Sequence, residues 1–413
     1  MVRAPAIDLL DVAVFAREGQ PHSQFAWLRK NDPVHWHPEP GGPGFWAVTR
    51  YEDVRQVSRQ SDIFSSWLGG VGIPDLGDGY LAASRNMMLV MDPPEHTRFR
   101  KLVSRGFMPR SAEAMTPRIK ELAGLIIDNV IERGECDLVR DIAGEPPSFV
   151  IAEMLGIPLE DGRRLYELTE VMHTDPATIS PQVQENARLE MLRYASTVAV
   201  QKRREPATDF GSILAAAEGA GEPLTEDEFN WFFLLLVNAG GDTTRNLVSG
   251  GMEALFNNPS ERERLHGDLD GLLPTAVEEM LRYVSPVVHF RRTATQETRL
   301  GGQRIAKGDK VVMFYGSANR DEEAFREPDR FDVGRAPNEH VAFGAGGVHF
   351  CLGAHLARIE ISAMLREILT RIPDVEPAGP IERLESVFIA GPKRLPVRFT
   401  PGSRGTAANP KPG

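Results

Sequence analysis

The sequence has few cysteines, no long apolar run and no excess of basic residues. Two cysteines among 413 residues exclude a disulfide framework and favour a reducing compartment. The most apolar run, Trp231 to Val237, is too short for a bilayer span of about 20 residues, and charged residues interrupt the first twenty positions where a signal peptide needs an apolar core. The net charge of −11 argues against a general nucleic-acid binder, which needs a basic surface. We therefore expect a cytoplasmic protein with no membrane anchor and no nucleic-acid partner.

Helical periodicity dominates the middle of the chain, up to about Tyr283. Short strands are predicted in four places, at Val34–His37, Phe45–Val48, Thr298–Tyr315 and Leu395–Phe399. The glycine-rich segment 69–79 is expected to be a loop. These patterns predict a mainly α fold with small β-sheets. We expect a single domain over residues 1–401 and a disordered tail over 402–413, because the tail is small and polar.

The segment 343–353, FGAGGVHFCLG, is the most informative in the chain. Its glycines allow backbone conformations that other residues resist. A strongly helical pattern follows Cys351, so the sulfur lies near a helix N-terminus, where an anionic metal ligand is favoured. Three other interpretations exist for this segment. It could be a turn with an inert cysteine, or a zinc site with His349 and His355, although a structural zinc site needs four ligands. It could also bind a dinucleotide, but the glycine order does not match that fingerprint.

A second segment, Asn238-Ala239-Gly240-Gly241-Asp242-Thr243-Thr244, follows an apolar run that predicts a buried helix. One interpretation is a helix that stops at Gly240 and restarts with Asp242 as its N-cap. The other is a functional helix whose glycines open a groove for a ligand and whose acid and hydroxyl handle protons. The residues alone support both interpretations about equally.

Charged residues recur at helical spacing in two further places. Glu279 and Arg282 lie on one helix face, and Glu278 could pair with Arg282 instead. His96 and Arg100 share a face of another expected helix. Each pattern alone is also compatible with solvated side chains.

Taken together, these motifs resemble the cytochrome P450 family. Its F-x-x-G-x-H-x-C-x-G, A-G-x-D/E-T, E-x-x-R and H-x-x-x-R patterns all occur here in family order, from the first hairpin to the last strand. Phe343 lies one residue upstream of the usual spacing, which indicates an insertion in the glycine run. The resemblance implies that haem b lies between a long central helix and the helix after Cys351.

The resemblance also implies roles for individual residues. Cys351 would be the axial thiolate, with Phe343 beside its sulfur. Thr243 would hydrogen-bond dioxygen, and Asp242 would relay protons. A brace on the thiolate side would consist of Glu279, Arg282 and Arg335. The remaining haem contacts would be His349, His96, Arg100, Arg292 (with Arg291 as the alternative), Gly344, Gly353, Ala239 and Gly240.

The acid and threonine of the family motif, Asp242 and Thr243, are both present, and this favours oxygen activation. We therefore expect a monooxygenase that hydroxylates an apolar substrate. The sequence has no flavin, nicotinamide or iron–sulfur motif. We therefore expect electrons from a ferredoxin and its reductase, docked near Arg358 and Arg366. Terpenoids, steroids and branched lipids are the expected substrates, under a lid formed by residues 66–89. The predicted pocket residues are Leu235, Asn238, Val287, Val288, Ile389 and Ala390.

Two alternatives of other classes stay open from the sequence. A haem-binding sensor or carrier would bind haem without oxidising a substrate. A non-haem thiolate protein would use His349, Cys351 and His355 for another metal and would be colourless.

Overall fold

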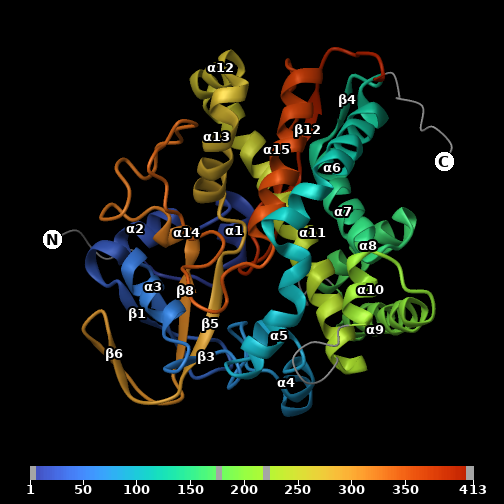
Figure 1. Ribbon diagram of the computed structural model, residues 1–413. Coiled ribbons are helices and arrows are strands. Elements are labelled where there is room, and N and C mark those ends of the chain that lie inside the picture. The colour runs from blue at the N-terminus through green and yellow to red at the C-terminus, as the bar shows by residue number, and fades with distance from the viewer. Residues whose placement is uncertain (1–5, 174–178, 217–223, 406–413) are drawn as a thin grey trace.

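The computed structural model describes residues 6–173, 179–216 and 224–405. Most of them are helical, and the strands of the largest sheet lie together on the left in Figure 1, away from β4 (Glu135–Asp137) and β12 (Pro396–Arg398). The α-helices are α1 (Val12–Glu18), α2 (His22–Asn31), α3 (Tyr51–Arg59), α4 (Asp78–Ser84), α5 (Glu95–Val103), α6 (Pro109–Val130), α7 (Glu145–Leu155), α8 (Leu159–His173), α9 (Pro181–Arg204), α10 (Phe210–Ala215), α11 (Glu226–Asn257), α12 (Pro259–Gly267), α13 (Leu269–Val284), α14 (Tyr315–Ala318) and α15 (Ala354–Arg371). Three further helical turns are η1 (Met88–Val90), η2 (Ser104–Phe107) and η3 (Leu138–Ala143).

The strands form small sheets, as the sequence predicts. They are β1 (Val34–His37), β2 (Phe45–Val48), β3 (Phe64–Ser65), β4 (Glu135–Asp137), β5 (His289–Ala294), β6 (Thr298–Leu300), β7 (Gln303–Ile305), β8 (Lys310–Phe314), β9 (Glu376–Pro377), β10 (Glu382–Arg383), β11 (Pro392–Arg394) and β12 (Pro396–Arg398). The largest sheet has the order β1-β2-β8-β5-β3, and three small sheets comprise β4-β12-β9, β10-β11 and β6-β7.

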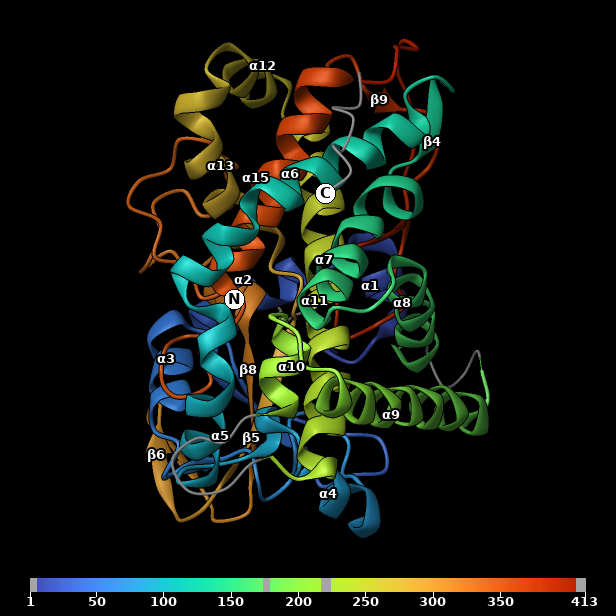
Figure 2. The ribbon, with the colours of Figure 1, turned by 45° about the vertical axis from the view of Figure 1, so that its right-hand side comes forward.

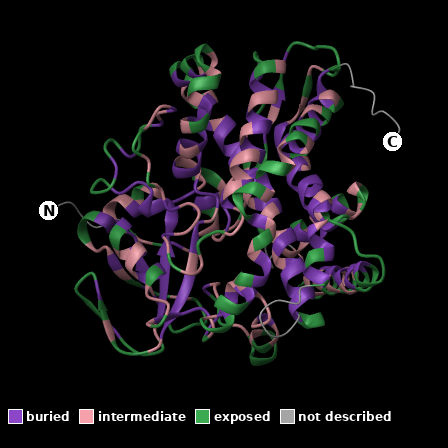
Figure 3. Cartoon of the chain, in the orientation of Figure 1, coloured by how far each residue is buried: buried purple, intermediate pink, exposed green. Residues whose placement is uncertain are grey.

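The predicted hairpin is confirmed, with Val34 opposite Val48 in the antiparallel pair β1–β2. The predicted β-rich patch is also confirmed as β6, β7 and β8. Strand β8 pairs in parallel with β2 and antiparallel with β5, so it joins the N-terminal hairpin to the chain after α13. Strands β5 and β8 lie at the buried centre of the sheet, coloured purple in Figure 3.

The long helix α11 runs through the middle of the helical part (Figures 1 and 2) and packs against α7, α9, α13 and α15. A capping box starts it: the Thr225 hydroxyl accepts from the Glu228 N–H, and the Glu228 carboxylate accepts from the Thr225 N–H. The stretch 231–237 of this helix is apolar on all sides, and this explains its central place in the core. The helix is continuous through Gly240 and Gly241, so the alternative of a break at Gly240 is wrong.

Buried side chains form one large cluster among the helices and two smaller clusters on the faces of the main sheet. Among the described residues, no helix is both long enough and apolar enough to cross a membrane. The prediction that the chain is disordered from Gly402 is wrong for residues 402–405. The Gly402 N–H donates to the Ile131 carbonyl, and the Gly405 N–H donates to Asp128 on α6. Residues 406–413 lie outside the described residues.

Candidate active site

The loop before α15 holds Cys351 in a strained glycine-rich turn. Gly344, Gly346 and Gly347 have φ values of 94°, 91° and 79°, a region that favours glycine, as the sequence predicts. A side chain on Gly347 would place its Cβ 2.4 Å from the Ser58 carbonyl oxygen at the end of α3. The loop therefore packs on α3 through backbone that tolerates no larger residue at this position.

Backbone hydrogen bonds fix the position of Cys351. Its N–H donates to the Phe343 carbonyl at 2.8 Å, and the Gly353 N–H donates to its sulfur. The residue is exposed as a whole, but surrounding protein atoms raise the pKa of its thiol, while Gly353, Arg100 and Arg358 act in the opposite direction. A coordinated metal deprotonates a thiol outright, so the raised pKa is compatible with a thiolate ligand. A Cβ on Gly353 would meet no atom within 4 Å, so the chain two residues after Cys351 faces open space.

Helix α11 presents one accessible stripe in an otherwise buried stretch. Between Glu228 and Met252, the residues that are not buried are Leu235, Asn238, Ala239, Gly240 and Thr243. Leu235 lies three to five residues before Asn238, Ala239 and Gly240, and Thr243 lies three to five residues after them. This spacing puts the five residues on the same side of the helix. The Thr243 hydroxyl on this face donates to the Ala239 carbonyl at 2.7 Å. Sequence reasoning placed these residues next to the haem or substrate, and the structure leaves Leu235, Asn238, Ala239 and Thr243 accessible on one face of α11.

The two glycines of α11 lie against neighbouring helices. A Cβ on Gly240 would lie 2.8 Å from Ile151 Cδ1 of α7, and a Cβ on Gly241 would lie 3.3 Å from the Tyr166 ring of α8. These glycines therefore allow α7 and α8 to approach closely. Their role in a groove for dioxygen stays a prediction.

Asp242 lies on a different side of α11 from Thr243. It is 4% exposed, and its Oδ1 lies 3.6 Å from Arg245 Nη2. Arg245 in turn donates to the Tyr166 hydroxyl and to Glu170 Oε1, both on α8. Glu170 is half-exposed, so the group extends from the buried acid to the surface. Sequence reasoning missed Arg245, although its spacing of three residues from Asp242 was a signal for the ion pair.

A group of basic side chains from three segments meets beside the cysteine loop. The His96 and His349 rings lie 4.5 Å apart, and Arg100 Nη1 donates to the Val348 and Phe350 carbonyls at 3.0 and 2.8 Å. His96 is 1% exposed, and neither ring nitrogen has a hydrogen-bond partner among the described residues. Burial and the charges of Arg100 and Arg292 lower the pKa of His96 to about 4.

The two candidate arginines of β5 point to different surroundings. Burial lowers the pKa of Arg292, and its charge lowers the pKa of both His96 and His349, so it lies near them. Arg291 instead donates to Asp75 at 2.8 Å and to the Ile73 carbonyl at 3.1 Å. The geometry therefore favours Arg292 over Arg291 as the residue beside the two histidines.

The predicted charged trio is assembled as one buried network. Arg282 Nε and Nη2 each donate to Glu279 at 2.8 Å, and both side chains are fully buried. Arg335 Nε donates to Glu279 Oε2 at 3.0 Å. Arg282 also donates to the Asn319 and Pro328 carbonyls, which ties α13 to the chain before the cysteine loop. Glu278 does not pair with Arg282.

The structure divides the predicted pocket residues into two groups. Leu235, Asn238 and Val287 are partly accessible, although Asn238 Oδ1 accepts from the Thr169 hydroxyl at 2.9 Å. Val288 and Ala390 belong to a core cluster with Phe314 and others, and Val288 is 0% exposed. Ile389 is buried too, at 7% exposure. Val288 and Ala390 thus pack in the core as well, and the role of Val288, Ile389 and Ala390 in a pocket stays a prediction.

The predicted lid segment contains a loop fixed by charge. Lys310 Nζ and Arg291 Nη1 both bind the Asp75 carboxylate, at 2.9 and 2.8 Å, and both donate to the Ile73 carbonyl. Lys310 is almost fully buried and also pairs with buried Glu39 at 2.8 Å. This anchor was missed from the sequence because its members are far apart in the chain.

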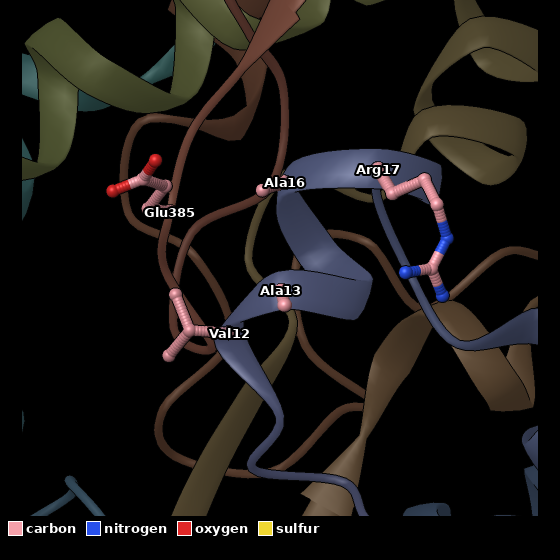
Figure 4. A pocket seen from close by; sticks show the side chains of 5 residues that line it. All are labelled: Val12, Ala13, Ala16, Arg17 and Glu385. Carbon is pink, nitrogen blue, oxygen red and sulfur yellow. The ribbon is translucent and has the colours of Figure 1, made fainter.

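Two observations bear on the other interpretations. Among the described residues, no group of three His, Cys, Asp or Glu side chains is placed to hold a metal, so the zinc interpretation of His349, Cys351 and His355 is wrong. A surface cavity of about 460 Å³ lies between α1 and the loop that carries Glu385. None of its lining residues, shown in Figure 4, is a predicted site residue.

The donor set fits haem b. A free, exposed cysteine can bind the iron through its sulfur, and a buried imidazole without a partner next to two arginines matches an anionic carboxylate.

Comparisons with known proteins show the family to which the chain belongs. The cytochrome P450 family model matches residues 184–378. The chain is 39% identical over 410 residues to a steroid C26-monooxygenase of Rhodococcus jostii, covering 96% of this chain and 86% of that protein. It is 41% identical over 389 residues to a methyl-branched lipid omega-hydroxylase of Mycobacterium tuberculosis, covering 91% and 90%. A Mycobacterium marinum cytochrome P450 solved in complex with pseudoionone matches with a TM-score of 0.89 at 39% identity, covering 97% and 100%. The chain belongs to the cytochrome P450 family, whose members are haem-thiolate enzymes with haem b.

Proposed function

We propose that this P450 monooxygenase hydroxylates a steroid or a branched, lipid-like substrate. One oxygen atom of dioxygen enters the substrate and the other leaves as water, which consumes two electrons and two protons. The relatives named above act on steroids and methyl-branched lipids. The accessible face of α11 is partly apolar, and this supports the binding of an apolar ligand against that face.

We assign the cofactor contacts to the chain's own side chains. Haem b, when bound, supplies the iron at which dioxygen is activated. Cys351 would bind its iron through sulfur, and His96, His349, Arg100 and Arg292 would hold its carboxylates. The observation that carries this assignment is the environment of His96. Both of its ring nitrogens are buried without a hydrogen-bond partner among the described residues, and such an imidazole needs a polar partner.

The distal residues would handle oxygen and protons. The Thr243 hydroxyl lies on the accessible face of α11 and could turn from the Ala239 carbonyl toward a ligand. Asp242 would hold a proton on the buried side, with Arg245 and Glu170 between it and the surface. Glu279, Arg282 and Arg335 would brace the opposite side of the haem.

Electrons would come from a separate ferredoxin and its reductase. The expected docking residues Arg358 and Arg366 are engaged in ion pairs with Glu278 and Asp270, so the structure does not support them. Lys101, Arg105 and Arg110 are exposed and form no ion pair within the described ranges. They lie at the end of α5, in η2 and at the start of α6. Arg100 of α5 contacts the cysteine loop, so these three are the better candidates for an acidic partner.

The first experiment is the absorption spectrum of the purified protein, reduced with dithionite and exposed to carbon monoxide. We expect the strongly red-shifted Soret band of a thiolate-ligated haem, and its loss in Cys351→Ala. A colourless protein, or a band like that of a His-ligated haem, would refute the assignment. Titrating the same preparation with a sterol and with a small charged compound tests the substrate class. A spin-state shift with the charged compound alone would contradict it.

A further inference from the structure

Three side chains from separate parts of the chain form a compact network on the thiolate side. Glu278 of α13 accepts two hydrogen bonds from Arg358 of α15, at 2.6 and 2.8 Å. The Ala342 N–H donates to His340 Nδ1, so the His340 proton lies on Nε2, which donates to Glu278 Oε2 at 3.0 Å. Helices α13 and α15 lie side by side in Figures 1 and 2, and the network bridges them.

The carboxylate of this network is firmly ionised. Burial raises the pKa of Glu278, but the hydrogen bonds from Arg358 and His340 outweigh burial and lower this pKa to about 2. Bidentate arginine–carboxylate pairs are directional as well as strong. Arg358 is therefore held in one orientation, although its side chain is 35% exposed.

That orientation places Arg358 against the residue that holds the cysteine backbone. The Arg358 guanidinium carbon lies 4.6 Å from the centre of the Phe343 ring, and the His340 ring centre lies 5.9 Å from the same ring. The Phe343 carbonyl accepts the Cys351 N–H at 2.8 Å. The network thus reaches the sulfur by a chain of direct contacts through Phe343.

The same arginine also acts on the sulfur through its charge. Arg358 Nη1 donates to the Ala354 carbonyl, three residues after Cys351, at 3.1 Å, and Arg100 Nη1 donates to the Phe350 carbonyl, next to Cys351, at 2.8 Å, so both place positive charge near the sulfur. Glu278 cancels part of the Arg358 charge because the two groups are in contact. The net field at the sulfur depends on the balance between these two side chains.

We infer that Glu278 and Arg358 are positioning residues that set the reduction potential of the iron, by fixing the Phe343 ring and balancing charge beside Cys351. The inference rests on the proposed role of Cys351 as axial ligand and is independent of the substrate. It gives Arg358 a role beside the cysteine loop, whereas the sequence alone placed this residue on the docking surface.

The test is a spectroelectrochemical titration of the purified holoenzyme with no redox partner present. Reduction adds one negative charge, so a positive charge nearby favours the reduced state. Glu278→Gln leaves the Arg358 charge uncompensated, and we expect the potential to rise. Arg358→Gln leaves the Glu278 charge uncompensated, and we expect the potential to fall. Arg358→Lys keeps the charge and is expected to restore most of the wild-type potential.

Arg366→Gln is the matched control, because Arg366 lies on the same helix and pairs with Asp270 at 2.7 Å away from the loop. We expect its potential to equal that of the wild type. Shifts in the same direction for Glu278→Gln and Arg358→Gln would overturn the electrostatic role. Unchanged potentials in variants that keep the red-shifted carbonyl band would overturn the inference alone. Absence of that band in the wild type would instead overturn the role of Cys351 as the iron ligand, and with it this inference. If Glu278→Gln does not fold, the Arg358→Gln and Arg358→Lys pair still decides the question.

Discussion

His289 is a buried histidine outside the haem contacts whose ionisation depends on folding. Its Nδ1 lies 3.0 Å from the Val387 carbonyl, and burial lowers its pKa from 6.5 to about 4. Between these values the unfolded chain binds a proton and the folded chain does not, so the stability from this site is complete above 6.5 and is lost as the pH falls toward 4.

This difference predicts a measurable loss of stability in acid. Between about pH 7 and about pH 5, the free energy of unfolding should fall by about 2 kcal/mol more in the wild type than in His289→Gln, which cannot take up the proton. Urea unfolding at the two pH values gives both free energies. Equal losses in the two proteins would show that His289 keeps an ordinary pKa in the folded state.

Residues close together in the chain were easier to predict than pairs far apart. The partnership of Glu279 with Arg282 was predictable because a spacing of three puts both on one helix face. The partner of Glu278 was not, since Arg358 is 80 positions away and only the packing of α13 on α15 brings them together. The core packing of Val288 and Ala390 was not predictable for a related reason: an apolar residue gives the same sequence signal whether it lines a pocket or fills a core.

At the scale of elements, the contact between the glycine loop and α3 gives a sharp prediction. Gly347→Ala adds a side chain at φ 79° and brings it 2.4 Å from a backbone carbonyl of α3. Gly344→Ala has a similar φ of 94° but no atom nearer than 3.7 Å, so it is a matched control for backbone strain alone.

We expect Gly344→Ala to cost about 1 kcal/mol of unfolding free energy through strain. Gly347→Ala should cost about 1–3 kcal/mol more, because α3 or the loop has to move. It should also lower haem content, since the loop carries Cys351. Urea unfolding and the haem-to-protein ratio are the measurements. Equal losses in the two variants would show that the loop does not depend on α3.

Element boundaries were predictable where the pattern is local. The hairpin β1–β2 was clear from alternating strands around a Pro- and Gly-rich turn. Strand β5 was not identified as a strand because its charged residues Arg291 and Arg292 obscure the apolar pattern, and their burial depends on Asp75 and the histidines. The continuity of α11 through Gly240 was also undecidable, because α7 and α8 supply the packing that offsets the low helix propensity of glycine.

At the scale of the whole molecule, the charge is unevenly distributed. The net charge of −11 would repel an acidic ferredoxin at long range. A local basic surface at Lys101, Arg105 and Arg110 would overcome this repulsion at short range, because nearby charges dominate the electrostatic potential there. Exposed Met108 lies between Arg105 and Arg110, and exposed Phe350 lies in the loop that Arg100 contacts, so both provide apolar contact area near this surface.

If this surface receives the electron donor, one charge reversal should slow electron transfer selectively. We expect Lys101→Glu to lower the bimolecular rate of reduction by a soluble [2Fe–2S] ferredoxin with its reductase roughly tenfold at low salt. The wild-type rate should fall as salt is added, because screening removes the attraction. Lys393→Glu makes the same change on β11, at an exposed lysine with no ion pair in the described ranges, and should leave the rate near that of the wild type. Reduction by dithionite, which needs no docking, should be equal in all three proteins. Equal slowing by Lys101→Glu and Lys393→Glu would mean that only net charge matters, and the donor surface would then have to be sought elsewhere.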